Sequence, residues 1–142
     1  QIVRDEINII AEKEDLEVRE YACTLLCAVV SNKGALFFQI GDGAMIVSKF
    51  GLMGIVFWPD NGEYANSTYF ITDENAIDRL RILKVESNID ELAIFSDGIQ
   101  NLALTNSSKT PHYPFFNSMF EFLRKVKNAD YDNLDKKLEL FS

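Results

Sequence analysis

Apolar residues follow one pattern through the middle of the chain and another near its two ends. Residues 2–20 carry a thin apolar stripe of Ile2, Ile7, Ile10 and Leu16 among many charges, which predicts an amphipathic helix. From residue 21 the chain becomes apolar and β-branched. It predicts strands at 21–30, 35–40, 44–50 and 54–58, separated by short turns that contain glycine. We therefore expect a meander of antiparallel strands joined by hairpins.

The second half continues with strands and then returns to a helical period. After a polar loop at 59–66 we expect a short strand at 68–72 and a brief helical turn at 74–79, with Asp73 as its N-cap. Two strands follow, at 80–86 and 91–95, and then a helical segment at 99–104. One face of a further amphipathic helix is marked by Phe115, Met119, Phe122, Leu123 and Val126. Strands flanked by helices indicate an α+β domain, and residues 1–142 are expected to form a single domain.

Composition narrows the classes of function. The 142 residues, 47% of them hydrophobic, suffice for one core. The net charge of -8 and the lack of a Lys/Arg cluster argue against nucleic-acid binding. No apolar stretch approaches the roughly 20 residues of a membrane span. On one strand Cys23 and Cys27 would lie ~13 Å apart, too far for a disulfide, so we expect reduced, buried thiols and a cytoplasmic protein.

Two aspartates lie in glycine turns directly after apolar strands. Asp42 stands in FFQIGDGAMIV and Asp97 in LAIFSDGIQNL. A carboxylate at a strand end is held rigidly, flanking glycines allow close approach, and Mg²⁺ and Mn²⁺ prefer such oxygen ligands. Each motif alone is weak, because Asp-Gly is also a common hairpin turn. The second is followed by a helix rather than a returning strand, and 55 positions (97 minus 42) separate the two.

Three segments resemble successive signatures of the type-2C, metal-dependent serine/threonine protein phosphatases: CTLLCAVV, GALFFQIGDGAMIV and ELAIFSDGI. The intervening GEYANSTYFIT is similar to a segment of bacterial members, and the resemblance runs from about Tyr21 to Leu104. It implies an antiparallel β-sandwich flanked by helices (α/β/β/α). It also implies hydrolysis of phosphoserine or phosphothreonine in a phosphoprotein substrate by a metal-activated water, with two or three Mn²⁺ or Mg²⁺ ions in the complete domain.

Residue by residue, the resemblance assigns Asp97 to the metal-ligating aspartate of Ser-Asp-Gly. It assigns Asp42 to the aspartate of the Gly-Asp-Ser turn, which assists a weaker third ion in the family. Gly41, Gly43 and Gly98 would shape these turns. His112 matches no family histidine and is interpreted as a loop residue.

The chain also departs from the family pattern. The early Asp-Gly-x-Gly-Gly segment and the late acidic ligand are expected before residue 1 and after residue 142, and the chain begins with Gln1 rather than Met. We therefore expect a phosphatase domain truncated at both ends, an incomplete metal site, impaired activity, and sheet edges open to self-association.

Two other interpretations stay open. A phosphatase-like module could lack catalysis and bind a phosphoprotein or regulate a partner. An unrelated α+β domain could use both aspartates only as turn residues, in which case their carboxylates should be far apart. Nothing in the sequence names the substrate.

Overall fold

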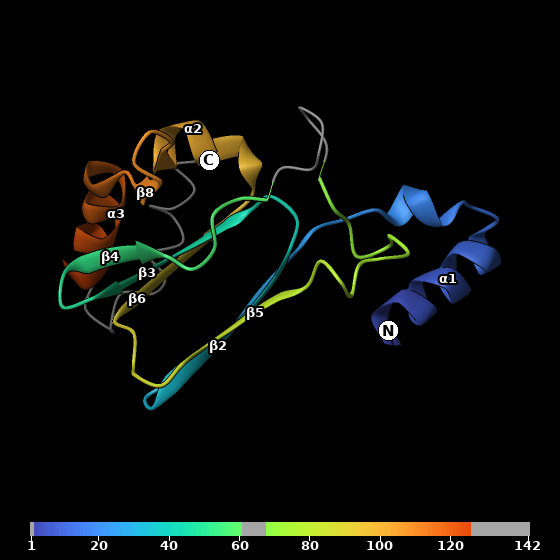
Figure 1. Cartoon of the computed structure of the whole chain (residues 1–142), viewed down its shortest axis with the longest axis horizontal. Helices are drawn as coiled ribbons and strands as arrows, with labels where there is room; N and C mark the ends of the chain where they lie inside the picture. The colour runs from blue at the N-terminus through green and yellow to red at the C-terminus, as the bar shows by residue number, and fades with distance from the viewer. Residues whose placement is uncertain (1, 61–67, 126–142) are drawn as a thin grey trace.

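The computed structural model describes residues 2–60 and 68–125, which form two three-stranded antiparallel sheets with helices at both ends (Figure 1). The first sheet has the order β1-β2-β5 and contains β1 (Leu25–Ser31), β2 (Gly34–Ile40) and β5 (Arg81–Val85). The second has the order β4-β3-β6 and contains β4 (Leu52–Ile55), β3 (Ala44–Lys49) and β6 (Glu91–Phe95). The expected α+β class with antiparallel sheets is confirmed.

The helical and short elements lie around these sheets. Helix α1 (Ile2–Glu14) and the 3-10 turn η1 (Val18–Tyr21) come first. After β6 follow η2 (Asp97–Ile99), α2 (Gln100–Ala103), the short strands β7 (Leu104–Thr105) and β8 (Thr110–Pro111), and α3 (Tyr113–Lys125). Helix α1 lies at the opposite end of the molecule from α3 (Figure 1). No helix in the described part of the chain is both long and apolar enough to cross a membrane.

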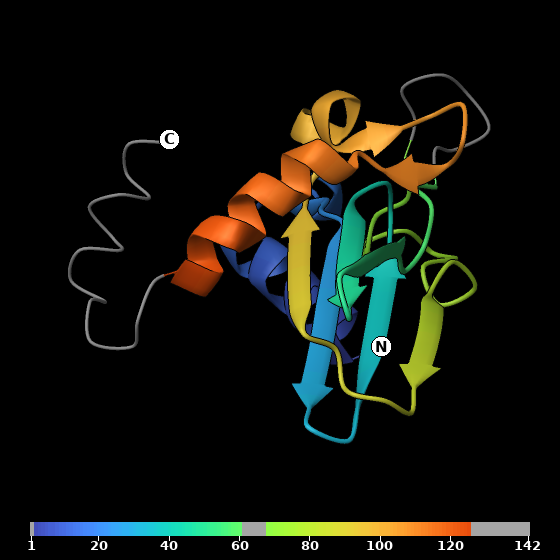
Figure 2. The same cartoon turned by 90° about the vertical axis from the view of Figure 1, so that its left-hand side faces the viewer.

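Strand β3 is buried on both faces, which explains the unbroken apolar run at residues 44–47. Its alternating side chains point to two different clusters. Met45 meets Ala35 and Phe37 of the first sheet. Ala44 and Ile46 instead join Phe116 and Phe120 of α3 in a second cluster. In Figure 2, α3 (orange) runs obliquely across the strands of the second sheet.

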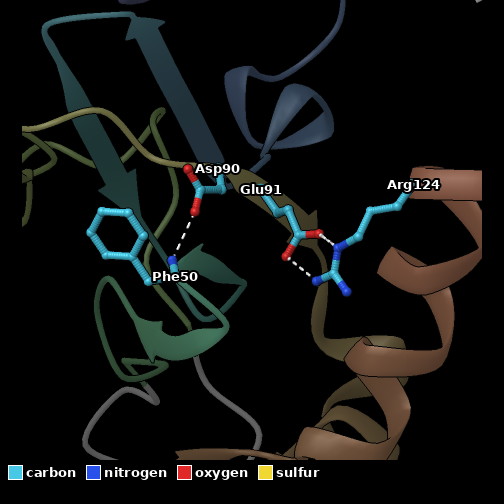
Figure 3. A network of polar contacts seen from close by, with 4 residues as sticks. All are labelled: Phe50, Asp90, Glu91 and Arg124. Carbon is cyan, nitrogen blue, oxygen red and sulfur yellow. Dashed lines mark hydrogen bonds and ion pairs between the residues drawn. The ribbon is translucent and has the colours of Figure 1, made fainter.

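An ion pair fastens α3 to β6 at the edge of that second cluster. Arg124 donates from Nε and Nη2 to the two carboxylate oxygens of Glu91, at 2.6 and 2.8 Å (Figure 3). The hydrogen bonds from Arg124 lower the pKa of Glu91, partial burial raises it, and the Ser48 hydroxyl lowers it further. The neighbouring Asp90 accepts from the backbone N–H of Phe50 at 2.7 Å and fixes the β3–β4 turn.

The expected meander is wrong at one connection. Residues 41–43 do not close a hairpin, because β2 ends in the first sheet and β3 begins in the second. The segment between β5 and β6 also changes sheet. In a hairpin the two strands pair with each other in one sheet. Here each of these connections joins a strand of the first sheet to a strand of the second.

Three local predictions also fail. The segment 68–72 forms no strand, although the Ile71 N–H reaches the Cys23 carbonyl at 2.9 Å. Asp73 does not cap a helix, because its carboxylate accepts from the Phe70 N–H, which precedes it, and successive turns follow. Helix α1 ends at Glu14, before Asp15 with its positive φ of 55°, so no single helix covers 2–20.

The predicted apolar face of the last helix is right in part. Phe115 packs against the second cluster as expected, but the buried residues are Phe116 and Phe120, and Met119 and Leu123 are 42% and 45% exposed. Val126 and most of the predicted 59–66 loop, residues 61–66, lie outside the described residues. Both cysteines are free, but Cys23 is exposed rather than buried.

Candidate functional site

The turns that carry Asp42 and Asp97 lie at the same end of the second sheet. Strands β3 and β6 are antiparallel neighbours, and Ala44 pairs with Phe95. Asp42 stands two residues before that pair and Asp97 two residues after it. Because the two strands run in opposite directions, both aspartates lie beyond the same end of the ladder. The fold therefore brings together two turns that are 55 positions apart (97 minus 42).

Both carboxylates lie where a ligand could reach them. Asp42 is half-buried, and Asp97 is exposed at the start of η2. Carboxylate oxygens on a rigid strand end suit a hard divalent cation, so the donor chemistry fits Mn²⁺ or Mg²⁺. Among residues 2–60 and 68–125, however, no group of three or more His, Cys, Asp or Glu side chains is arranged to hold a metal. Asp42 and Asp97 therefore stay candidate ligands, and the described residues add no third one beside them.

At the two positions beside Asp42, neighbouring atoms leave no room for a side chain larger than that of glycine. Gly41 has φ +99°, and a Cβ there would lie 2.4 Å from the Thr24 methyl group. A Cβ on Gly43 would lie 2.4 Å from Leu26 Cδ1 and 3.0 Å from the Phe95 carbonyl oxygen. Real Cβ atoms do not approach other heavy atoms at 2.4 Å, so any larger residue would displace the turn.

Gly98 differs from these two glycines. A Cβ at this position would meet nothing within 4 Å, and Gly98 is not among the residues with positive φ. Neither crowding nor backbone conformation within the described residues requires glycine here. Its predicted role in shaping the Asp97 turn finds no steric basis in the structure.

Buried side chains hold the carbonyl groups of the Asp42 turn. Gln39 is fully buried, and its Nε2 donates to the carbonyls of Gly41 and Gly43, at 3.2 and 2.7 Å. Arg81 pairs with Gln39 across the β2–β5 ladder and donates to the same Gly41 carbonyl at 3.3 Å. It also donates to the Trp58 carbonyl at 2.7 Å. The sequence analysis predicted a role for neither Gln39 nor Arg81. Gln39 could have been noticed, because it is a polar residue within the apolar run FFQI.

The charge of Arg81 is fixed in this setting. Burial lowers the pKa of its guanidinium, and the nearby Asp60 carboxylate offsets part of that effect. Because an arginine loses its proton only in strongly basic solution, it stays protonated at any pH where the fold is stable. Arg81 is thus a permanent donor beside the Asp42 turn.

The ring and the backbone N–H of His112 make their hydrogen bonds with helix α2. It is exposed between β8 and α3, and its Nδ1 is 3.1 Å from the Leu102 carbonyl oxygen. Its backbone N–H also donates to the Ala103 carbonyl at 2.8 Å. These contacts agree with its interpretation as a loop residue.

Comparison with known proteins identifies the family. The sequence profile of the protein phosphatase 2C family matches residues 1–141. The chain belongs to this family. It is also 39% identical over 139 residues to serine/threonine-protein phosphatase 3 of Escherichia coli (strain K12). No solved structure matches the chain.

The two sequence matches confirm the resemblance drawn from CTLLCAVV, GALFFQIGDGAMIV and ELAIFSDGI. The alignment with the Escherichia coli phosphatase covers 98% of this chain and 55% of the relative. The chain therefore spans about half the length of that relative. Membership of the phosphatase family excludes the third interpretation, an unrelated α+β domain.

Proposed function

We propose that the protein to which this chain belongs hydrolyses phosphoserine and phosphothreonine in proteins with the help of Mn²⁺ or Mg²⁺. One observation carries the proposal: Asp42 and Asp97, which the resemblance to the family assigns to metal binding, extend from the same end of the β3–β6 pair. This juxtaposition depends on the fold, because either turn alone could be an ordinary glycine turn. Membership of the phosphatase 2C family supports the reaction class.

In this proposal Asp97 holds a catalytic ion and Asp42 holds a further, weaker one. Such ions supply Lewis acidity and neutralise the charge of the phosphoryl group during transfer to water. The protein contributes the position of each carboxylate, through β6 for Asp97 and through the Gly41–Gly43 turn for Asp42. Two carboxylates form only part of a two-metal centre, so further ligands complete it in the active protein.

The proposed architecture of the complete domain is the α/β/β/α sandwich of the family. The apolar cluster of Ala35, Phe37 and Met45 between the two sheets supports this arrangement. The helix α3 on the second sheet would be one outer layer. The substrate would be a phosphoprotein.

The test is phosphatase activity of the complete gene product on a phosphothreonine peptide, with and without Mn²⁺. We expect Mn²⁺-dependent turnover that Asp97→Asn abolishes. Even outer partners of a metal contribute about 10–100-fold, and loss of a ligand should cost more. Asp78→Asn, an exposed aspartate on the turns before β5, makes the same charge change and should retain full activity.

Two outcomes would count against the proposal. Turnover that persists without a divalent cation, or in Asp97→Asn, would remove Asp97 from the catalytic centre. A folded protein that binds Mn²⁺ but releases no phosphate would favour the non-catalytic, phosphoprotein-binding module.

A further inference from the structure

One side chain connects the two aspartate turns directly. Gln100 is the first residue of α2, three positions after Asp97, and its Nε2 donates to the backbone carbonyl of Asp42. The β3–β6 ladder ends at the Ala44–Phe95 pair, so this bond lies beyond the last backbone pairing of the two strands. It therefore joins the two turns where the sheet no longer does.

The remaining carbonyls of the Asp42 turn are bound from other directions. Gln39 binds the carbonyls on both sides of Asp42, and Arg81 binds one of them from β5. With Gln100, every carbonyl of residues 41–43 accepts a hydrogen bond from a side chain. Of the three donors, only Gln100 comes from the element that follows Asp97. Gln39 and Arg81 fix the turn to the first sheet, and Gln100 fixes it to the other aspartate.

The spacing between two metal-binding carboxylates decides how well ions bind. Ligands must be held within about 0.5 Å of the productive position, and residues that orient them typically contribute about 10–100-fold to metal affinity. A hydrogen bond to the backbone of Asp42 moves the whole residue, carboxylate included. A half-buried amide such as Gln100 is suited to this task, because it carries no charge that would attract or repel the ion.

We propose that Gln100 is a positioning residue that sets the distance between the Asp42 and Asp97 carboxylates through the Asp42 carbonyl. This inference rests on the proposed function, in which both aspartates serve one metal centre. The proposal predicts an effect on metal affinity rather than on folding. Loss of the Gln100 donor should lower the affinity for the ion that Asp42 holds. A bond that served only to begin α2 would leave that affinity unchanged.

The experiment titrates the complete gene product with Mn²⁺ and measures the free ion by electron paramagnetic resonance. Asp42→Asn first identifies the binding step to which Asp42 contributes. Gln100→Met, close in shape but without the donor, should raise the dissociation constant of that same step by about 10–100-fold. Asn101→Ala, an exposed neighbour on α2, is the matched control and should bind like the wild type.

The outcomes separate this inference from the proposed function. If Asp42→Asn and Asp97→Asn leave Mn²⁺ binding unchanged, the proposed metal centre is wrong and the role of Gln100 falls with it. If Asp42→Asn removes a step that Gln100→Met leaves intact, the metal centre stands and the positioning role is overturned. Thermal unfolding of each variant shows whether it folds. Gln100→Ala repeats the test without added bulk, and unfolding of both Gln100 variants would assign the bond to folding and overturn the inference.

Discussion

Gly41 has a backbone conformation that larger residues adopt only with strain. Its φ of +99° and the 2.4 Å approach to the Thr24 methyl group leave no place for a Cβ. We expect Gly41→Ala to lower the free energy of unfolding by about 1–3 kcal/mol, the usual cost of a strained backbone position. Urea denaturation of the complete gene product measures this change.

Gly98→Ala is the matched control for that substitution. Its site is open, and its φ is not positive, so its effect on stability should stay within about 0.5 kcal/mol. Equal losses for the two variants would contradict the account of the Asp42 turn.

At the scale of single residues, the sequence showed the aspartates and not the donors that hold them. Asp42 and Asp97 are visible because glycine turns after apolar strands are local signals. Gln39 left a weaker signal, a polar residue in an apolar run. Gln100 left none, because its partner is 58 positions away and the contact exists only after the two sheets have formed.

Helix α3 depends on two aromatic side chains for its contact with the second sheet. Phe116 is fully buried between Phe95, Phe115 and Phe120, with ring centroids 5.1–6.1 Å apart. We expect Phe116→Ala to lower the free energy of unfolding by about 3–5 kcal/mol, as for other large-to-small changes in a core. Met119→Ala, on the exposed side of the same helix, should cost about 1 kcal/mol or less. Thermal or urea unfolding distinguishes the two, and a larger loss at Met119 would contradict the observed burial.

The Glu91–Arg124 pair makes the attachment of α3 sensitive to acid. The pKa of Glu91 is lower in the folded protein than its unfolded value of about 4.3, because Arg124 binds the ionised form. The stabilisation is therefore present above about pH 4.3, and it is lost as the pH falls through the lower folded pKa. A partly exposed pair of this kind contributes up to about 1 kcal/mol.

Arg124→Met tests this contribution in unfolding experiments from pH 7 to pH 3. The variant should be less stable than the wild type at neutral pH, and the difference should shrink at the acid end. Lys125→Met, next along the helix in an exposed pair with Glu121, is the control. A difference that stays constant over the whole pH range would show that Arg124 acts through packing and not through the charge of Glu91.

At the scale of elements, the spacing of apolar residues predicted where most strands lie but not which sheet each strand joins. The runs at 35–40, 44–50 and 91–95 became β2, β3 and β6 because their apolar patterns fit buried strands. The glycine turn at 41–43 is equally compatible with a hairpin and with a change of sheet. The change of sheet is accompanied by a contact from distant sequence, the hydrogen bond from Arg81 to Gly41 across 40 positions, which exists only in the tertiary structure. The face of α3 was predicted only in part because apolar residues occur on several sides of that helix.

At the scale of the whole molecule, the pairing of β3 with β6 places two motifs that are far apart in sequence at the same end of one sheet. The chain belongs to the phosphatase 2C family and spans about half the length of the Escherichia coli relative. In the part of it that the structure describes, the turns that carry Asp42 and Asp97 lie at one end of the β3–β6 pair and are joined by Gln100. The central claim is that both carboxylates serve one metal centre.

The most direct test is crystallography of the complete gene product soaked in Mn²⁺, with anomalous diffraction to locate the ions. The account predicts an anomalous peak in contact with the Asp97 carboxylate, and a second at the Asp42 carboxylate as the Mn²⁺ concentration rises. Ordered crystals with Mn²⁺ bound elsewhere, and both carboxylates without an ion, would contradict it.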